Sequence, residues 1–285
     1  MNSCRLCAKS SDLKDGHIIP DFVGRWVKET SVTGKLRDLD NINNRIQDLV
    51  KYKFLCADCE SDFGKYEKYF AEQFFKPYLN LKQLHFCYDD NLRKFVISLA
   101  WRLLNHWDKD INWKHSRHEK AAIDTEKRWH EYLLNNECNN IPENHLFFLE
   151  TIQNHPKIPG TTASLNFYLF RGVDATIMQN EEEALIYIKI PGFIILSSVT
   201  EVPFSEELNS TIEESGQFEV EHPTMSENLM YYVINRAKEQ LMKFATLSQN
   251  QLKRISDDYN KNEEKIENSF LTKMDDFIIP KKNGV

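Results

Sequence analysis

The stretch CRLCAKSSDLKDGHIIP, residues 4–20, begins with two cysteines that stand two residues apart. A second pair with the same spacing occurs in FLCADCE, residues 54–60. A C-x2-C pair lets one tight turn offer two sulfur ligands to the same ion, and two pairs complete the tetrahedral shell that zinc prefers. The sequence therefore predicts a structural Zn²⁺ site with four ligands: Cys4, Cys7, Cys56 and Cys59.

The alternative is that the two pairs are unrelated buried thiols. The pairs are separated by 48 residues, which is more than in a simple zinc ribbon, so a shared site requires the intervening chain to form a small fold of its own. The remaining cysteines, Cys87 and Cys138, lie in apolar or mixed surroundings and are expected to be ordinary thiols.

Length and composition are those of a globular protein. The chain has 285 residues, of which 41% are hydrophobic and 28% charged, and this length is typical of one or two domains. No apolar run approaches the roughly 18 residues of a membrane helix, and the N-terminus lacks the apolar core of a secretory signal. We expect a soluble cytoplasmic protein with reduced cysteines and no membrane partner.

Negative charge is concentrated in one segment. The net charge is −7, but residues 181–221 alone contain ten Glu and one Lys. Most of this acidity is expected on a solvated loop. Because the rest of the chain is close to neutral, the overall charge does not exclude a nucleic-acid partner.

Apolar residues at helical spacing follow the second cysteine pair. Aromatic side chains recur every three or four residues in the segment 59–79, where Pro77 is expected to end the helix. Residues 90–107 repeat the pattern with aliphatic side chains. Residues 116–136 predict a third, more polar helix at the periphery.

The pattern changes beyond Pro142. Short β-rich runs separated by turn residues predict an antiparallel sheet. These runs are 145–152, 163–172, 174–180, 184–191 and 193–200. From Met225 to residue 277 the chain is again helical in pattern, first with an apolar face and then mostly charged.

His17 lies between the cysteine pairs, in the sequence HIIPDFVGRWV, which predicts a short strand that turns at Pro20 into a helix. With the downstream FLCADCE, this arrangement resembles the HNH, or His-Me finger, nuclease family. The sequence is also similar to uncharacterised bacterial proteins labelled HNH-like. The resemblance covers about residues 4–70. It implies that His17 is the general base that activates a water for attack on a DNA phosphodiester, beside a divalent ion such as Mg²⁺ or Mn²⁺.

Three positions depart from the family pattern. Gly16 stands where these enzymes usually carry an Asp or His metal ligand, and Asp15, one residue earlier, is the candidate substitute. The middle Asn of the motif has no clear match. The last motif position is Glu60, whose carboxylate suits Mg²⁺ or Mn²⁺.

The sequence thus predicts an α+β protein with a ββα-metal or treble-clef-like finger, a helical segment, an antiparallel sheet and C-terminal helices. The expected divisions are 1–75 for the zinc-binding HNH-like finger, 76–140 for helices packed on it, 141–221 for the β region with its acidic loop, and 222–285 for the C-terminal helices.

Two functions fit these observations. The first is a metal-dependent endonuclease acting on DNA. The second is a catalytically inactive, zinc-stapled module that binds protein or nucleic acid. In either case the C-terminal half is expected to contact a protein partner or to form a homodimer.

Overall fold

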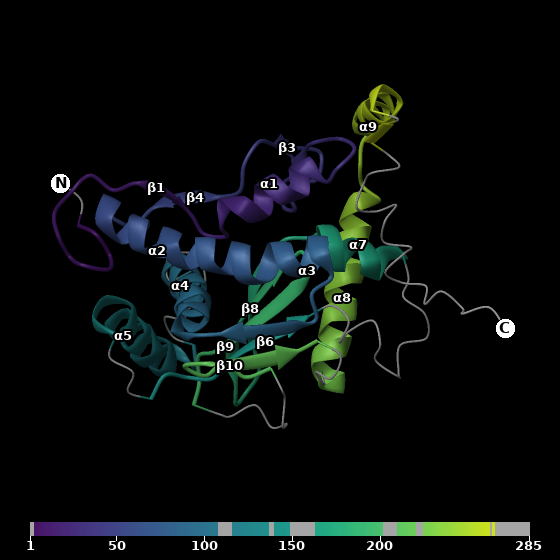
Figure 1. Ribbon diagram of the computed structural model, residues 1–285. Helices are drawn as coiled ribbons and strands as arrows, with labels where there is room; N and C mark the ends of the chain where they lie inside the picture. Colours follow the sequence, from purple (N-terminus) through teal and green to yellow (C-terminus); the bar gives the residue numbers. More distant parts are fainter. Residues whose placement is uncertain are drawn as a thin grey trace.

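The computed structural model describes residues 3–107, 116–136, 140–148, 163–201, 210–220, 225–262 and 264–265. It is an α+β structure in which helices surround a four-stranded antiparallel sheet (Figure 1). Within these ranges, no helix combines the length and apolar character needed to cross a membrane. Cys138 and residues 266–277 of the predicted C-terminal helix lie outside the described residues.

The four-stranded sheet has the order β6-β9-β8-β7. Its strands are β6 (Asn144–Phe148), β7 (Asp174–Gln179), β8 (Ala184–Ile190) and β9 (Phe193–Ser198). Every residue of β8 and β9 is buried, which requires cover on both faces of the sheet. The predicted antiparallel sheet is therefore present.

The two faces pack against different helices. Phe193 at the start of β9 contacts the rings of Phe75 and Tyr78, which follow the long helix α2 (Ala57–Phe70). Tyr187 contacts Tyr232 of α8 (Glu227–Phe244). Phe193 pairs with Ile190, and alternate side chains of a strand point to opposite faces, so the helical segment that follows α2 and the helix α8 pack on opposite sides of the sheet.

The N-terminal region contains small antiparallel pairs and a short helix. Its elements are β1 (Asp15–His17), α1 (Asp21–Glu29), β2 (Leu36–Arg37), β3 (Arg45–Ile46) and β4 (Lys51–Lys53). β1 pairs with β4, and β2 pairs with β3. The predicted strand and its turn at Pro20 into a helix are confirmed.

The prediction that Pro77 ends the helix is wrong. After α2 the chain makes one π-helical turn, Ala71–Phe75, and continues as α3 (Lys76–Leu81). The Lys76 N–H donates to the Ala71 carbonyl, five residues back. Proline has no N–H and its ring collides with the carbonyl four residues before it in an α-helix, and the wider π turn makes room for it.

The helix predicted as peripheral buries one of its faces in the core. It is α5 (Glu119–Asn135), and its Trp129 and Tyr132 are fully buried. It packs on α4 (Asp90–Trp107), where the Trp101 Nε1–H donates to Glu126 at 2.8 Å. The apolar positions of α5 recur every three or four residues, so an amphipathic face is buried although the overall composition is polar.

Residues 163–172 were expected as a strand, but the structure has the helix α7 (Ala163–Arg171). Leu165, Tyr168 and Leu169 are buried, at the spacing of one helical face. The fully buried Lys189 of β8 donates to the carbonyls of Tyr168 and Gly172 at the end of this helix. A lysine side chain near a helix C-terminus can hydrogen-bond the last carbonyls of the helix.

The remaining elements connect the sheet to its surroundings. β5 (His85–Tyr88) pairs with β10 (Gly216–Glu219), and α9 (Gln249–Lys261) follows α8. In the described parts of the acidic segment 181–221, the glutamates are exposed except Glu183, which is half-buried. They lie outside the buried strands β8 and β9, so the acidity is indeed solvated.

The structure predicts a large stability loss when the aromatic core is truncated at Phe70. This ring is fully buried and lies 4.1 Å from Phe95 and 5.2 Å from Phe193, centroid to centroid. We expect Phe70→Ala to lower the free energy of unfolding by about 3–5 kcal/mol, measured by urea titration. Leu81→Ala is the control, because Leu81 is 75% exposed and should change stability by less than about 0.5 kcal/mol.

Candidate functional site

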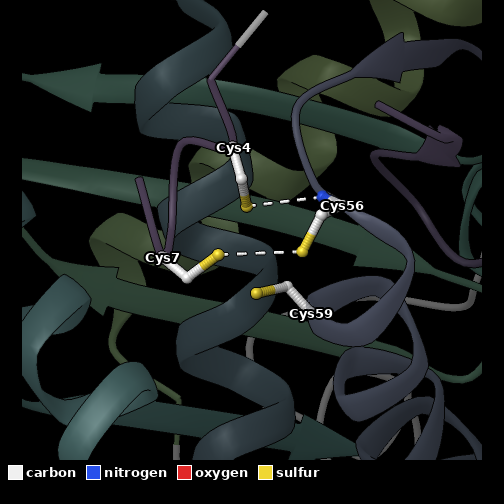
Figure 2. Close-up of side chains that lie close together, drawn as sticks. All are labelled: Cys4, Cys7, Cys56 and Cys59. Atoms are coloured by element: carbon white, nitrogen blue, oxygen red, sulfur yellow. Dashed lines mark hydrogen bonds between the residues drawn. The ribbon is translucent and has the colours of Figure 1, made fainter. Parts of the chain in front are cut away.

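The four predicted cysteine ligands come together. Their sulfur atoms all lie within 4.8 Å of one another, and Figure 2 shows them gathered between the N-terminal loop and the start of α2. Cys7 Sγ and Cys56 Sγ are 3.7 Å apart. Sulfurs bound tetrahedrally at about 2.3 Å are about 3.8 Å apart, so the arrangement fits a bound metal ion.

Backbone hydrogen bonds bring the two cysteine pairs together. The Arg5 N–H donates to the Phe54 carbonyl and the Lys14 N–H to the Leu55 carbonyl, both at 2.9 Å. On the other side, His130 Nε2 lies 2.6 Å from the Leu6 carbonyl, which ties α5 to the first pair. The intervening chain thus forms the small fold that a shared site requires.

The surroundings favour a thiolate at Cys4. Burial opposes its ionisation, but backbone N–H donors, including that of Cys56 at 3.3 Å, lower the pKa of Cys4 to about 7. Burial instead raises the pKa of Cys59. A bound cation would favour the ionised form of all four thiols, because the thiolate is the metal ligand.

His17 lies at the end of β1, opposite Lys51 of β4, and its ring meets two carboxylates. His17 Nε2 is 2.9 Å from Asp48 Oδ1 and 4.0 Å from Asp21 Oδ1. The side chain of His17 is 15% exposed, while those of Asp48 and Asp21 are 35% and 38% exposed. One imidazole and two accessible carboxylates therefore share a small surface site.

Asp48 is the central group of this site because its carboxylate contacts both His17 and Lys51. Burial alone would raise its pKa, but hydrogen bonds with Lys51 and His17, and the charge of His17, lower the pKa of Asp48 to about 2. Lys51 Nζ is 2.5 Å from Asp48 Oδ2. Asp48 is therefore an ionised carboxylate at neutral pH and can orient the imidazole.

The two other predicted site residues lie near His17 in different ways. Glu60, in the first turn of α2, packs against Gly16: a Cβ built on Gly16 would lie 2.5 Å from Glu60 Oε1. Burial raises the pKa of Glu60, although Arg102 and His17 partly offset this effect. Asp15 is exposed and lies opposite Lys53, and the cluster around His17 does not include it.

A buried arginine, Arg102, holds the backbone of His17 from the core side. Arg102 of α4 is 2% exposed, and its Nη1 donates to the His17 carbonyl at 2.5 Å. Its Nη2 donates to Glu67 Oε1 of α2 at 2.8 Å. Arg102 therefore connects the strand that carries His17 to two helices.

A groove of about 560 Å³ lies between α1 and the helical segment from α2 to α3, and it shares Asp21 with this site. Asp21 lies at its edge, and the aromatic rings of Phe22 and Trp26 line it. Charged side chains of both signs also line it, among them Arg25, Glu29, Glu67, Lys68 and Glu72. A groove of this size and mixed character suits a polar ligand more than an apolar one.

Sequence reasoning missed two members of the site. Asp21 is the first residue of the helix after Pro20, four positions from His17, and this spacing was the available signal. Asp48 comes beside His17 because β1 pairs with β4 in one register, and the sequence did not specify that register.

Comparison with family models, with curated proteins and with solved structures finds no match.

Metal binding at the cysteine cluster is directly testable. We expect the purified chain to contain about one equivalent of tightly bound metal, and Cys56→Ser to lose most of it, because a four-ligand shell would be broken. Unfolding stability should fall by an amount on the order of several kcal/mol, since metal binding is coupled to folding. Elemental analysis by mass spectrometry and urea titration measure the two effects.

Cys87→Ser is the matched control for this experiment, because Cys87 is exposed and lies outside the cluster. It should leave the metal content unchanged. Equal metal content in wild-type chain and Cys56→Ser would contradict a metal site at the four cysteines.

Proposed function

We propose that this chain is a metal-dependent endonuclease of the HNH, or His-Me finger, kind, which cleaves phosphodiester bonds in DNA. The observation that supports it is the position of His17. It ends a strand, pairs with a second strand, faces two carboxylates, and lies beside the helix that begins at the second cysteine pair. A ββα-metal finger held by structural zinc is the form that these elements suggest.

His17 acts as the general base in this proposal. When Nε2–H donates to Asp48, at 2.9 Å, the lone pair of the neutral ring lies on Nδ1. That nitrogen takes the proton from the attacking water. The ionised Asp48 stabilises the imidazolium that forms, and Arg102 holds the backbone of His17 in place from behind.

A divalent ion such as Mg²⁺ or Mn²⁺ fits the oxygen donors that surround His17. Asp21 and Asp48 would hold it, since accessible carboxylates are the preferred ligands of these ions. When bound, the ion supplies charge stabilisation to the phosphate and its leaving oxygen.

The Glu60 carboxylate is also available near this position, although it belongs to the helix. Its oxygens occupy the space beside Gly16 in which a side chain from the strand would otherwise lie. We infer that Glu60 provides from α2 the negative charge that the family pattern places immediately before the base.

The second candidate is a zinc-stapled binding module without catalysis. It is favoured by the same Gly16, which offers no ligand of its own, and by Asp15, which is exposed and outside the cluster. In that case His17, Asp48 and Lys51 form a surface network that stabilises the β1–β4 pair.

A plasmid-nicking assay with added Mg²⁺, Mn²⁺ or Ni²⁺ distinguishes the two candidates. We expect nicking by the wild-type chain and a loss of about 10²–10⁴-fold in His17→Ala, because the proton acceptor is removed. Asp48→Asn should also lower the rate, since the amide cannot stabilise the imidazolium by charge.

Two variants control for changes in surface chemistry. His85→Ala removes an exposed histidine from β5, and Asp40→Asn removes an exposed aspartate from the β2–β3 turn. Both should nick DNA at the wild-type rate. Absence of nicking with every metal, or equal nicking by wild-type chain and His17→Ala, would overturn the endonuclease proposal and favour the binding module.

A further inference from the structure

The β2–β3 hairpin carries two arginines directly opposite each other. Arg37 and Arg45 are cross-strand partners, so their side chains leave the hairpin on the same side. Burial and the neighbouring charge of Arg45 lower the pKa of Arg37, and the charge of Asp258 opposes this effect. Like charges in this position repel, and an anion between them relieves the repulsion.

In this structure α9 lies over the arginine pair and supplies that anion. Asp258 Oδ2 is 2.9 Å from Arg45 Nη1, and Gln251 Oε1 accepts from Arg37 at 3.3 Å. Just before the helix, the Ser248 N–H donates to Asn43 Oδ1 at 2.8 Å. Figure 1 shows α9 beside the loop that contains β3.

The helix α9 lies on the surface of the hairpin and contributes no buried residue to the core. None of the residues Gln249–Lys261 is buried, so the helix has no apolar anchor in the core. Asp258 and Gln251 contact the hairpin through one ion pair and one hydrogen bond of 3.3 Å. The helix can therefore leave the hairpin without disrupting the core.

The contact with α9 leaves part of the Arg45 guanidinium without a hydrogen-bond partner among the described residues. Its Nε and Nη2 are buried and have no hydrogen-bond partner among the described residues. The contact from Nη1 to Asp258 is an ion pair without hydrogen-bond alignment, because Asp258 Oδ2 also lacks a hydrogen-bond partner there. Nε and Nη2 form the edge of the guanidinium that binds a phosphate through two parallel hydrogen bonds.

The arginine pair lies close to the His17 site along the chain. Arg45 is three residues before Asp48, so their Cα atoms are at most about 11 Å apart. Lys28 of α1 donates to the Gln47 carbonyl at 2.8 Å and fixes this connection to the helix that begins at Asp21. A nucleic-acid strand in the His17 site would pass within reach of the hairpin.

We propose that Arg37 and Arg45 form a phosphate-binding site for the nucleic-acid strand, and that α9 covers this site through Asp258 until the strand displaces it. Naming the ligand as nucleic acid depends on the function proposed above. The cover itself depends only on the contacts between α9 and the hairpin.

The test measures binding without cleavage. The full-length chain carries His17→Ala, no divalent ion is added, and fluorescence anisotropy follows a short labelled DNA duplex. We expect Asp258→Asn to tighten binding by roughly fivefold or more, and to steepen the dependence of log K on log salt by about 1–2, since each phosphate contact contributes about 0.9. Adding Arg37→Gln and Arg45→Gln to this variant should remove both effects.

Asp257→Asn is the matched control, because it makes the same charge change on the exposed side of α9. If it tightens binding as much as Asp258→Asn, the effect is one of net charge and the inference is overturned. The same holds if the arginine substitutions leave the affinity of Asp258→Asn unchanged. If the wild-type chain does not nick plasmid but Asp258→Asn still tightens DNA binding as expected, the covered site is supported and the endonuclease proposal is overturned.

Discussion

The meeting of four sulfur atoms between the first residues of the chain and the start of α2 is the constraint on which the N-terminal region depends. The sulfur atoms of Cys7 and Cys56 lie 3.7 Å apart. Closing the loop between these two residues costs conformational entropy. The chain between them forms one short helix, α1, and four strands of two or three residues. Ion binding can offset that cost, because the ligand shell does not exist in the unfolded chain.

The same constraint positions the groups around His17. Cys56 immediately precedes α2, so fixing its sulfur fixes the first turn of the helix and, with it, Glu60. Arg102 then joins β1 and α2 from the opposite side. The absent side chain at Gly16 is part of this arrangement, because any larger residue would have to displace the Glu60 carboxylate. The glycine in the strand is thus matched by a close contact with the helix.

Periodicity and motif spacing were sufficient to predict much of the fold. The cysteine cluster, the strand and helix around Pro20, and the strands β8 and β9 all follow from local patterns. The failures have specific causes. Residues 163–171 are rich in β-forming aromatic residues, and only their packing on α8 and the sheet makes them helical. Asp48 lies beside His17 because β1 and β4 pair in one register. That register depends on contacts between distant segments of the chain.

The π turn before Pro77 has a consequence for the phase of the helices. A π turn acts as one inserted residue, and one residue corresponds to a rotation of about 100° around a helix axis. The side chains of α3 are therefore rotated relative to those of an uninterrupted α2, and Tyr78 and Leu79 are both buried in the new phase. The spacing of residues across 71–75, more than their identity, thus determines which surface of α3 faces the sheet.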